Sequence, residues 1–375
     1  MDQIALATPL PGRSAQVVFS GARRDFIRLV RRGAFLELVT AGFYRFWLAT
    51  DIRRALWSGT SIEGDAAEYT GTARELLIGF LFALAILVPV YLVYFLIGIE
   101  VERAKAFASL PLFLFFYAFG QFAIFRARRY RATRTVWRGV RFWMTGSGWA
   151  YAWRACLWTF VTFFTLGLLL PWRESALERY KMRHLHYGDL SARFEGSGWT
   201  LFKRGWWLWL LSFPIITIPF IYPAYRAVLW RWWIEGARFG ALRFESALRT
   251  GGLMGLYWAT IGWIVLFMSL VGAVLGIITA ALPHLIGAPA GAAGIMWLIR
   301  QHPILVFALY IANYLVIALF AGFVVRIYLI RGVWERVVTS ATAYNLESAD
   351  EVRAMGDLAS ALGEGLADGL DVAGF

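Results

Sequence analysis

Two small groups of ionisable side chains outside the apolar segments could carry chemistry. His184 and His186 are two residues apart, which places them on different faces of a helix, and no nearby cysteine or third histidine completes a metal set. Glu63, Asp65 and Glu68 form a carboxylate cluster, but acid–base catalysis needs carboxylates positioned in a cleft. We expect the histidine pair to be solvated or interfacial and the carboxylates to lie in a solvated loop, and we predict no catalytic residue, metal site, cofactor or enzymatic activity.

Polar side chains inside apolar segments are a second kind of candidate. Gln121 and Asn313 are the strong polar side chains of the four longest apolar segments, whereas Glu37 and Arg154 lie in shorter ones. Ionisable groups within a membrane usually mark transport paths. Glu37 and Arg154 are therefore candidate functional positions if they lie at membrane depth. If they lie near the interface, they are ordinary side chains whose charged ends extend to the lipid headgroups.

Composition indicates a membrane protein. Of 375 residues, 59% are hydrophobic and 16% are charged, against roughly 25% charged residues in ordinary soluble domains. The mean hydropathy is +0.59. The single cysteine, Cys156, excludes an intrachain disulfide.

Four apolar segments are long enough to cross a bilayer, and three others are shorter. Residues 76–98, 107–125, 256–282 and 303–325 contain no charged residue or histidine, so they are predicted to be transmembrane helices. The shorter segments, residues 33–49, 155–172 and 206–227, contain glycine, proline or charge. We therefore predict an all-α fold, a polytopic helical membrane protein with internal repeats, in which four transmembrane helices accompany three short, broken or re-entrant segments.

Self-similar blocks organise the chain. Phe19-Ser-Gly21 is matched by Phe194-Glu-Gly196, and each precedes an apolar run that ends in aromatic residues and arginine. A longer block runs from Tyr69-Thr-Gly71 and is matched from Phe244 onward. The predicted division is a flexible N-terminus (1–18), short blocks (19–68, 142–193, 194–243), long blocks with two transmembrane helices each (69–141, 244–342) and an acidic tail (343–375).

These motifs resemble the YjgN-like family of bacterial inner-membrane proteins. The resemblance rests on the Phe-x-Gly openings, on Thr165-Leu-Gly167 followed by Pro171-Trp172, and on the run from Tyr69 to Leu77. It covers roughly residues 18–340. It implies a multi-pass location in the bacterial inner (cytoplasmic) membrane, and it implies no activity.

The charge distribution predicts an orientation and a partner. Residues 126–141 contain seven arginines and no acid, so this loop is expected in the cytoplasm. The net charge of +13 favours contact with anionic lipid headgroups at the cytoplasmic face over nucleic acid, because the basic residues flank apolar segments. The candidate lipid contacts are Arg126, Arg128, Arg129, Arg131 and Arg134. The acidic tail contains Leu358, Leu362 and Leu366 at four-residue spacing, which suggests a short amphipathic helix. The alternative is a solvated, partly disordered tail, which is the commoner outcome for such a segment.

Two functions remain open at this stage. The chain could transport or accommodate a small or lipidic molecule between its related halves. Alternatively, it could be an envelope scaffold or lipid-organising protein without translocation. Because basic residues flank both ends of each short segment, we expect these segments to break near Gly42, Gly167 and Pro219 and to return to the cytoplasmic side. The alternative is that each segment crosses the membrane once, which would place one of its basic flanks outside. The sequence gives no oligomeric state.

Overall fold

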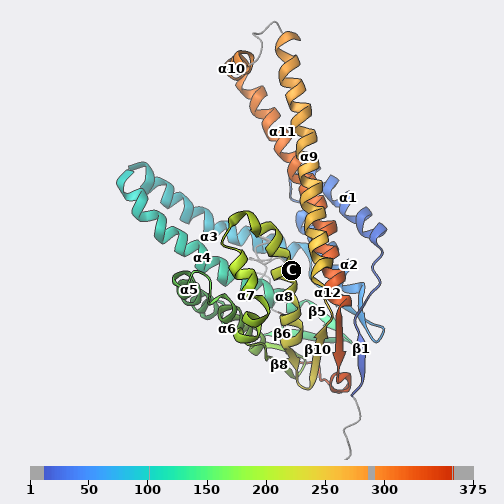
Figure 1. Cartoon of the computed structure of the whole chain (residues 1–375). Coiled ribbons are helices and arrows are strands. Elements are labelled where there is room, and N and C mark those ends of the chain that lie inside the picture. Colours follow the sequence, from blue (N-terminus) through green and yellow to red (C-terminus); the bar gives the residue numbers. More distant parts are fainter. Residues whose placement is uncertain (1–11, 101, 286–291, 357, 359–375) are drawn as a thin grey trace, which may run out of the picture.

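Short strands alternate with helix hairpins along the chain (Figure 1). The computed structural model describes residues 12–100, 102–285, 292–356 and 358. Within these ranges, eleven strands form one sheet in the order β1-β11-β10-β9-β8-β7-β6-β5-β4-β3-β2. The strands are β1 (Ser14–Gln16), β2 (Val18–Phe19), β3 (Thr60–Ile62), β4 (Asp65–Tyr69), β5 (Thr135–Trp137), β6 (Val140–Met144), β7 (Leu185–Tyr187), β8 (Leu190–Phe194), β9 (Ala237–Phe239), β10 (Leu242–Ser246) and β11 (Ala341–Tyr344).

The N-terminal strands join the two edges of this antiparallel sheet. Strand β1 pairs with β11, β2 pairs with β3, and Val17 alone separates β1 from β2. Val17 is buried and its backbone N–H donates to the carbonyl of Ala341 at 2.9 Å. The sheet therefore approaches a closed barrel, which leaves few unpaired backbone groups at its edges.

Two-residue turns connect the strands of each β-hairpin. In the β3–β4 turn, Glu63 and Gly64 have φ values of 53° and 90°, and in the β5–β6 turn Arg138 and Gly139 have φ values of 50° and 73°. Positive φ at both central positions defines a type I′ turn, whose twist matches that of the flanking strands.

The prediction of an all-α fold is wrong, because the structure contains this eleven-stranded sheet as well as the helices. Its strands have two to five residues, and a period-two pattern is recognisable only over about four to eight residues. Segments interpreted as basic loops also contribute to it, since Arg138 lies in the β5–β6 turn and Arg141 in β6.

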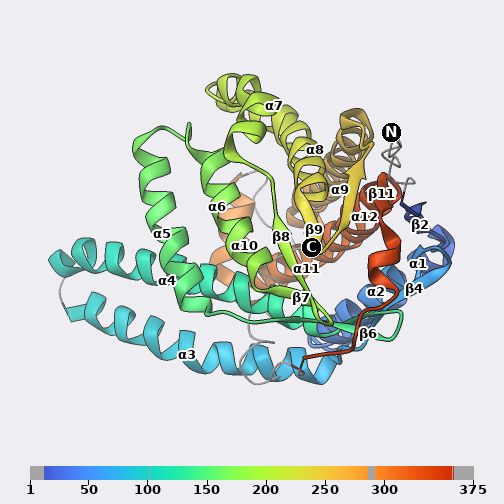
Figure 2. The ribbon, with the colours of Figure 1, turned by 90° about the horizontal axis from the view of Figure 1, so that it is seen from below.

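Five helix hairpins leave the sheet and return to it. Seen from below, they follow one another around the strands in chain order (Figure 2). Their helices are α1 (Arg23–Val39), α2 (Arg45–Ser58), α3 (Ala73–Glu100), α4 (Glu102–Thr133), α5 (Gly148–Phe164), α6 (Leu170–Arg183), α7 (Gly198–Leu211), α8 (Ile218–Gly236), α9 (Thr250–Leu285), α10 (Ala292–Gln301), α11 (Pro303–Val325) and α12 (Gly332–Thr339). A 3₁₀ turn, η1 (Ile215–Thr217), precedes α8, and a π-helical segment, η2 (Arg326–Arg331), joins α11 to α12.

One backbone hydrogen bond recurs at the base of every hairpin. The N–H of the residue after the outgoing strand donates to a carbonyl where the returning helix ends, at 2.8–2.9 Å in each case. The five pairs are Ser20–Gly59, Thr70–Arg134, Thr145–His184, Glu195–Gly236 and Ala247–Ser340. Each helix hairpin is thus fastened to the sheet in the same way.

Four helices are long and apolar enough to cross a membrane. Within the described residues, the candidate spans cover residues 73–96, 110–133, 250–278 and 303–339. The helices α3, α4, α9 and α11 contain the four predicted segments. Figure 1 shows α3 with α4, and α9 with α11, as two long hairpins that project from the sheet in different directions. In the most apolar 18-residue stretches of the spans that begin with α9 and α11, none of the described residues is buried inside the protein. These surfaces suit lipid rather than water.

The three short segments are broken helix pairs. Between α1 and α2, Ala41 and Gly42 have positive φ, and between α5 and α6 Leu166 and Gly167 do. These breaks lie where the sequence predicts them. The third break precedes its predicted position, because Pro219 occupies the first turn of α8, where its missing N–H costs no hydrogen bond. Which membrane face these pairs enter stays a prediction.

The chain ends add to the sheet. Strand β1 falls within the segment expected to be a flexible N-terminus, and β11 begins just before the predicted acidic tail. A 3₁₀ turn, η3 (Leu346–Ala349), then buries Leu346 and Ala349 against Trp137 and Tyr187 of the β-hairpins. Leu362 and Leu366, predicted to lie on an amphipathic helix, are outside the described residues.

Candidate functional site

Glu37 lies on the buried face of α1. Phe26, Val30, Gly33 and Glu37 are the buried residues of this helix, and their spacing of three or four places them on one side. Glu37 is 7% exposed. A carboxylate carried into this position needs a cationic partner, because burial of an unpaired charge is strongly unfavourable.

Arg326 supplies that partner from the other end of the chain. Its Nη1 and Nη2 atoms donate to the two carboxylate oxygens of Glu37 at 2.8 and 2.7 Å, a bidentate ion pair. Arg326 is the first residue of the π-helical segment η2. Such segments are rare and often occur at functional sites.

This ion pair lines a cavity of about 530 Å³, hereafter the Glu37 pocket. Its walls come from the α1–α2 turn, from α2, from the start of α3 and from α11. Three guanidinium groups and one carboxylate line it, those of Arg45, Arg53, Arg326 and Glu37. The remaining wall is largely apolar. The apolar side chains include Leu38, Ile52, Leu76, Leu315 and Leu319.

Packing positions the two arginines of α2 that line the Glu37 pocket. Arg45 lies over the rings of Phe46 and Phe80, with 4.8 and 4.5 Å from its guanidinium carbon to the ring centroids. Arg53 is buried, and its Nη1 donates to the Tyr69 hydroxyl at 3.3 Å. Among the described residues, the pocket therefore combines three guanidinium groups and one carboxylate with an apolar wall, a combination that suits an amphipathic anion.

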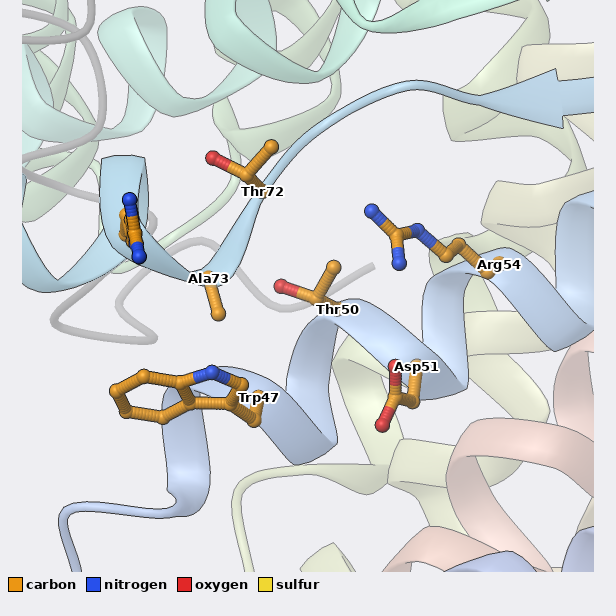
Figure 3. A pocket seen from close by; sticks show the side chains of 7 residues that line it. Trp47, Thr50, Asp51, Arg54, Thr72 and Ala73 are labelled. Atoms are coloured by element: carbon orange, nitrogen blue, oxygen red, sulfur yellow. The ribbon is translucent and has the colours of Figure 1, made fainter.

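A second cavity, of about 390 Å³, opens on another face of α2 (Figure 3). Trp47, Thr50, Asp51 and Arg54 of α2 line it together with residues 72–74. Thr50 Oγ1 donates to the Phe46 carbonyl at 2.9 Å, and Arg54 Nη2 donates to the Gly71 carbonyl at 2.9 Å. Burial raises the pKa of Asp51, although Arg54 and Arg32 oppose the shift. Because Thr50 and Arg54 already donate to backbone carbonyls, they are less available to a ligand. This cavity is therefore a weaker candidate for a ligand site than the Glu37 pocket.

The other predicted polar positions lie away from the Glu37 pocket. Gln121 in α4 and Asn313 in α11 are half-buried. Arg154 is exposed on α5, where it donates to the Ala150 carbonyl at 2.8 Å and lies over the Tyr180 ring. Of the four predicted polar positions, Glu37 alone lines this cavity.

The five arginines predicted to contact lipid lie in the last turns of α4 and just beyond. Arg128 pairs with Glu178 at 2.7 Å, and Arg134 is 4% exposed and pairs with Glu75 at 2.7 Å. Arg126 lies over the Phe122 ring, and Arg129 and Arg131 are half-buried. At least Arg128 and Arg134 thus have their charges balanced inside the protein.

The two ionisable groups outside the apolar segments lie in the strands of the sheet or directly beside them. Glu63 and Asp65 both pair with Arg138, at 2.7 and 2.6 Å. His186 stacks on Trp143, and the pKa of His186 is lowered by burial. Among the described residues, no group of three or more histidine, cysteine, aspartate or glutamate side chains could hold a metal ion.

Sequence reasoning noted Arg45, Arg53 and Arg326 only as members of repeats or as orienting charges. One signal could have singled out Arg326, because it directly follows a long uncharged apolar segment while Glu37 lies in another apolar segment. Opposite charges that must both approach the membrane are expected to pair. Their separation of 289 residues hides the contact.

Among the described residues, the fold combines an antiparallel sheet with four helices that are long and apolar enough to cross a membrane, which is compatible with a membrane protein. The chain belongs to DUF898, a family described as bacterial protein of unknown function, whose model matches residues 14–224 and 213–358. This is the family commonly called YjgN-like, so the resemblance found in the sequence is confirmed. No curated protein and no solved structure matches the chain.

Proposed function

We propose that this chain is a non-enzymatic protein of the bacterial inner membrane that accommodates a lipidic molecule in the Glu37 pocket. The observation that carries the proposal is the lining of that pocket, where Arg45, Arg53 and Arg326 accompany leucines from α1, α3 and α11. An anionic headgroup fits the guanidinium groups. The acyl chains fit the apolar wall and the exposed surface of α11, which is continuous with it.

The proposed orientation places the sheet in the cytoplasm. Many arginines lie near the sheet, in the last turns of α4 and in the β-hairpins, whereas Arg300 is the one fixed charge of residues 283–302 at the far end of the α9–α11 hairpin. Cytoplasmic flanks of membrane helices carry an excess of arginine and lysine. In this orientation the Glu37 pocket lies between the sheet and the distal parts of the spans, at the level of the cytoplasmic headgroups.

Internal repetition of the helix hairpins is part of the same proposal. Two observations support it: the identical hydrogen bond at the base of each hairpin, and a shared contact at three strand ends. A Cβ added to Gly21, Gly71 or Gly196 would collide with the aromatic ring two residues earlier, at 2.5–2.6 Å. Superposition of the hairpins in an experimental structure tests this. If these aromatic-glycine pairs fail to coincide, the blocks are not repeats.

An alternative is a lipid-organising protein with no bound molecule. Its supporting observation is the exposure of large apolar side chains at the short hairpin tips, including Phe43, Phe163 and Ile216. Three such tips resting in one leaflet would order the surrounding lipid. In proteoliposomes, transfer of a fluorescent lipid between leaflets would support translocation. Its absence together with retained lipid binding would favour accommodation alone.

A pocket-filling variant separates the two functions. Ala318 of α11 lines the Glu37 pocket, whereas Ala312 of the same helix does not and is exposed. We expect lipid to co-purify with the wild-type chain and with Ala312→Trp, and to be lost from Ala318→Trp, as measured by native mass spectrometry. Equal lipid retention in all three proteins would contradict a bound molecule in this pocket and would favour the lipid-organising alternative.

A further inference from the structure

The outward face of α1 is divided along its length. Arginines occupy the part near the sheet, and apolar side chains occupy the part near the α1–α2 turn. Phe35 and Val39 are 64% and 66% exposed, and Phe43 in the turn is 56% exposed. Figure 1 shows α1 at the outer edge of the molecule. The exposed arginines on the side away from the buried Phe26 and Val30 are Arg24, Arg28, Arg31 and Arg32, hereafter the α1 basic face.

The described part of the chain balances little of the charge on this face. Arg28 pairs with Asp25 at 3.3 Å, but the two side chains are 64% and 69% exposed, so this surface pair contributes little to stability. The other three arginines form no ion pair within 4.0 Å with a described residue. Arg32 interacts electrostatically with Asp51 of α2, but from beyond that distance. The α1 basic face is therefore available to an external anion.

The same boundary between exposed charge and apolar tip recurs in the other two short hairpins. The last exposed cation of α5 is Arg154, ten residues before the end of that helix, and the last exposed cation of α7 is Arg204, seven residues before its end. In α1 the last exposed cation is Arg32, seven residues before the end. At a rise of 1.5 Å per residue, each tip carries no exposed cation over about 10–15 Å. That length matches one leaflet of a hydrocarbon core about 30 Å thick.

A membrane surface fits α1 better than a soluble partner does. An acidic protein would neutralise the arginines but would leave the adjoining Phe35 and Val39 in water. A bilayer matches both parts at once, because helices of this kind bind through buried apolar area together with attraction to anionic lipids. The exposed cations of α7 are Lys203 and Arg204, and that of α5 is Arg154. The larger number of arginines on α1 should therefore gather anionic lipid there most strongly.

We propose that the α1 basic face binds the headgroups of anionic phospholipids in the cytoplasmic leaflet, with Phe35 and Val39 inserted among the acyl chains of the same leaflet. Each arginine near an anionic surface adds attraction, which salt screens. The inference rests on the membrane orientation given under the proposed function. It does not depend on a lipid in the Glu37 pocket, because Glu37 lies on the buried face of α1, away from these arginines.

Quenching by brominated lipids tests this inference. The full-length protein carries an environment-sensitive fluorophore at Phe35→Cys, in a Cys156→Ala background, and is reconstituted in phosphatidylcholine nanodiscs. The nanodiscs also contain phosphatidylglycerol or phosphatidylethanolamine with brominated acyl chains, at the same mole fraction. We expect both lipids to quench the fluorophore, and brominated phosphatidylglycerol to quench it about twofold more efficiently or better, with the difference lost at high salt.

Matched double variants assign this preference to α1. Arg28→Gln with Arg31→Gln should reduce the preference for phosphatidylglycerol by about half or more, because each arginine contributes to the attraction. Arg183→Gln with Arg193→Gln is the control, since it removes the same net charge from exposed positions at the end of α6 and in β8. The control should leave the preference unchanged.

The Ala318→Trp background separates this inference from the proposed function, because it fills the Glu37 pocket. The preference should persist there. Its loss would trace the quenching to a lipid in that pocket and would overturn the inference. Absence of quenching by either lipid would place the α1 tip in water and would favour a soluble acidic partner instead. Equal quenching by the two lipids, or equal effects of the two double variants, would overturn the inference as well.

Discussion

The carboxylate of Glu37 and the guanidinium of Arg326 are joined by two hydrogen bonds of 2.7 and 2.8 Å, although 289 residues separate them in sequence. The pair fastens α1 to the end of α11, so the first helix and a candidate span are held together. It also neutralises the carboxylate of Glu37, which lines the Glu37 pocket together with Arg45 and Arg53.

Glu37→Gln should lower the stability of the protein, because Arg326 loses its bidentate partner in a site that is largely shielded from water. Removal of one partner from a fully buried pair costs roughly 3–5 kcal/mol. We expect a smaller loss, about 2–3 kcal/mol, since the Arg326 side chain is 21% exposed. Thermal unfolding in detergent measures it. Asp25→Asn, which removes an exposed ion pair on the same helix, should cost less than about 1 kcal/mol. Equal effects of the two variants would contradict a structural role for the Glu37 pair.

The C-terminal segment should loosen in acid. Hydrogen bonding from Arg13, assisted by Arg138, holds the pKa of Asp350 below its ordinary value of 3.8. Because the folded-state pKa is depressed, this stabilisation is fully present above pH 3.8 and is lost as the pH falls through the lower, folded-state pKa. Hydrogen exchange of residues 345–353, corrected for intrinsic rates, should rise only below that pH. Asp350→Asn should show the loosened state already at pH 7. Unchanged exchange in Asp350→Asn would mean that these ion pairs do not anchor the segment.

Two glycine substitutions in helices should have opposite effects. A Cβ on Gly33 would lie 2.3 Å from the Leu48 side chain, which is fully buried, whereas a Cβ on Gly205 meets open space. Gly33→Ala should therefore destabilise the α1–α2 pair by about 1–2 kcal/mol, the usual cost of overpacking. Gly205→Ala should stabilise α7 by up to about 1 kcal/mol, because alanine favours helix. Parallel thermal unfolding of the two variants checks this, and a stabilising Gly33→Ala would refute the close approach of α1 to α2.

Cysteine labelling tests the orientation. Thr133, the natural choice within the predicted basic loop, is buried and unsuitable. Ser191 in β8 and Gln301 at the end of α10 are exposed. In a Cys156→Ala background, a membrane-impermeant maleimide added to intact spheroplasts should label Gln301→Cys but not Ser191→Cys. Labelling of Ser191→Cys from outside would invert the proposed topology.

The membrane helices were predictable because their apolar runs are long and uninterrupted. The turns at Gly42 and Gly167 were predictable because glycine interrupts shorter apolar runs there. The sheet was not predicted, since each strand is brief and is stabilised by neighbours from distant parts of the chain. A usable signal was present in Glu63-Gly64 and Arg138-Gly139, because a residue followed by glycine between short β-branched or aromatic segments favours a type I′ hairpin.

The candidate site was predictable only in part. Glu37 stands out as an acid in an apolar segment. Its partner Arg326 lies in a distant block, and the position of Arg326 directly after an apolar segment is the signal that could have suggested the contact. Arg134 was expected at the lipid surface, but it is buried and forms an ion pair with Glu75 of the preceding helix. Arg326 and Arg134 are both placed by ion pairs with residues from other helices, and the periodicity of the sequence does not reveal such pairs.

Lipid binding to purified full-length protein, quantified by native mass spectrometry, tests the central claim most directly. Phosphatidylglycerol and phosphatidylethanolamine with identical chains are compared. We predict that the wild type prefers the anionic lipid, and that Arg45→Gln with Arg53→Gln weakens its binding by about tenfold or more, the size of one charged hydrogen bond. Arg154→Gln, which changes an exposed arginine outside the Glu37 pocket, should bind as the wild type does. Equal binding of the two lipids by the wild type, or an unaffected Arg45→Gln/Arg53→Gln variant, would contradict the Glu37 pocket as the site of an anionic lipid.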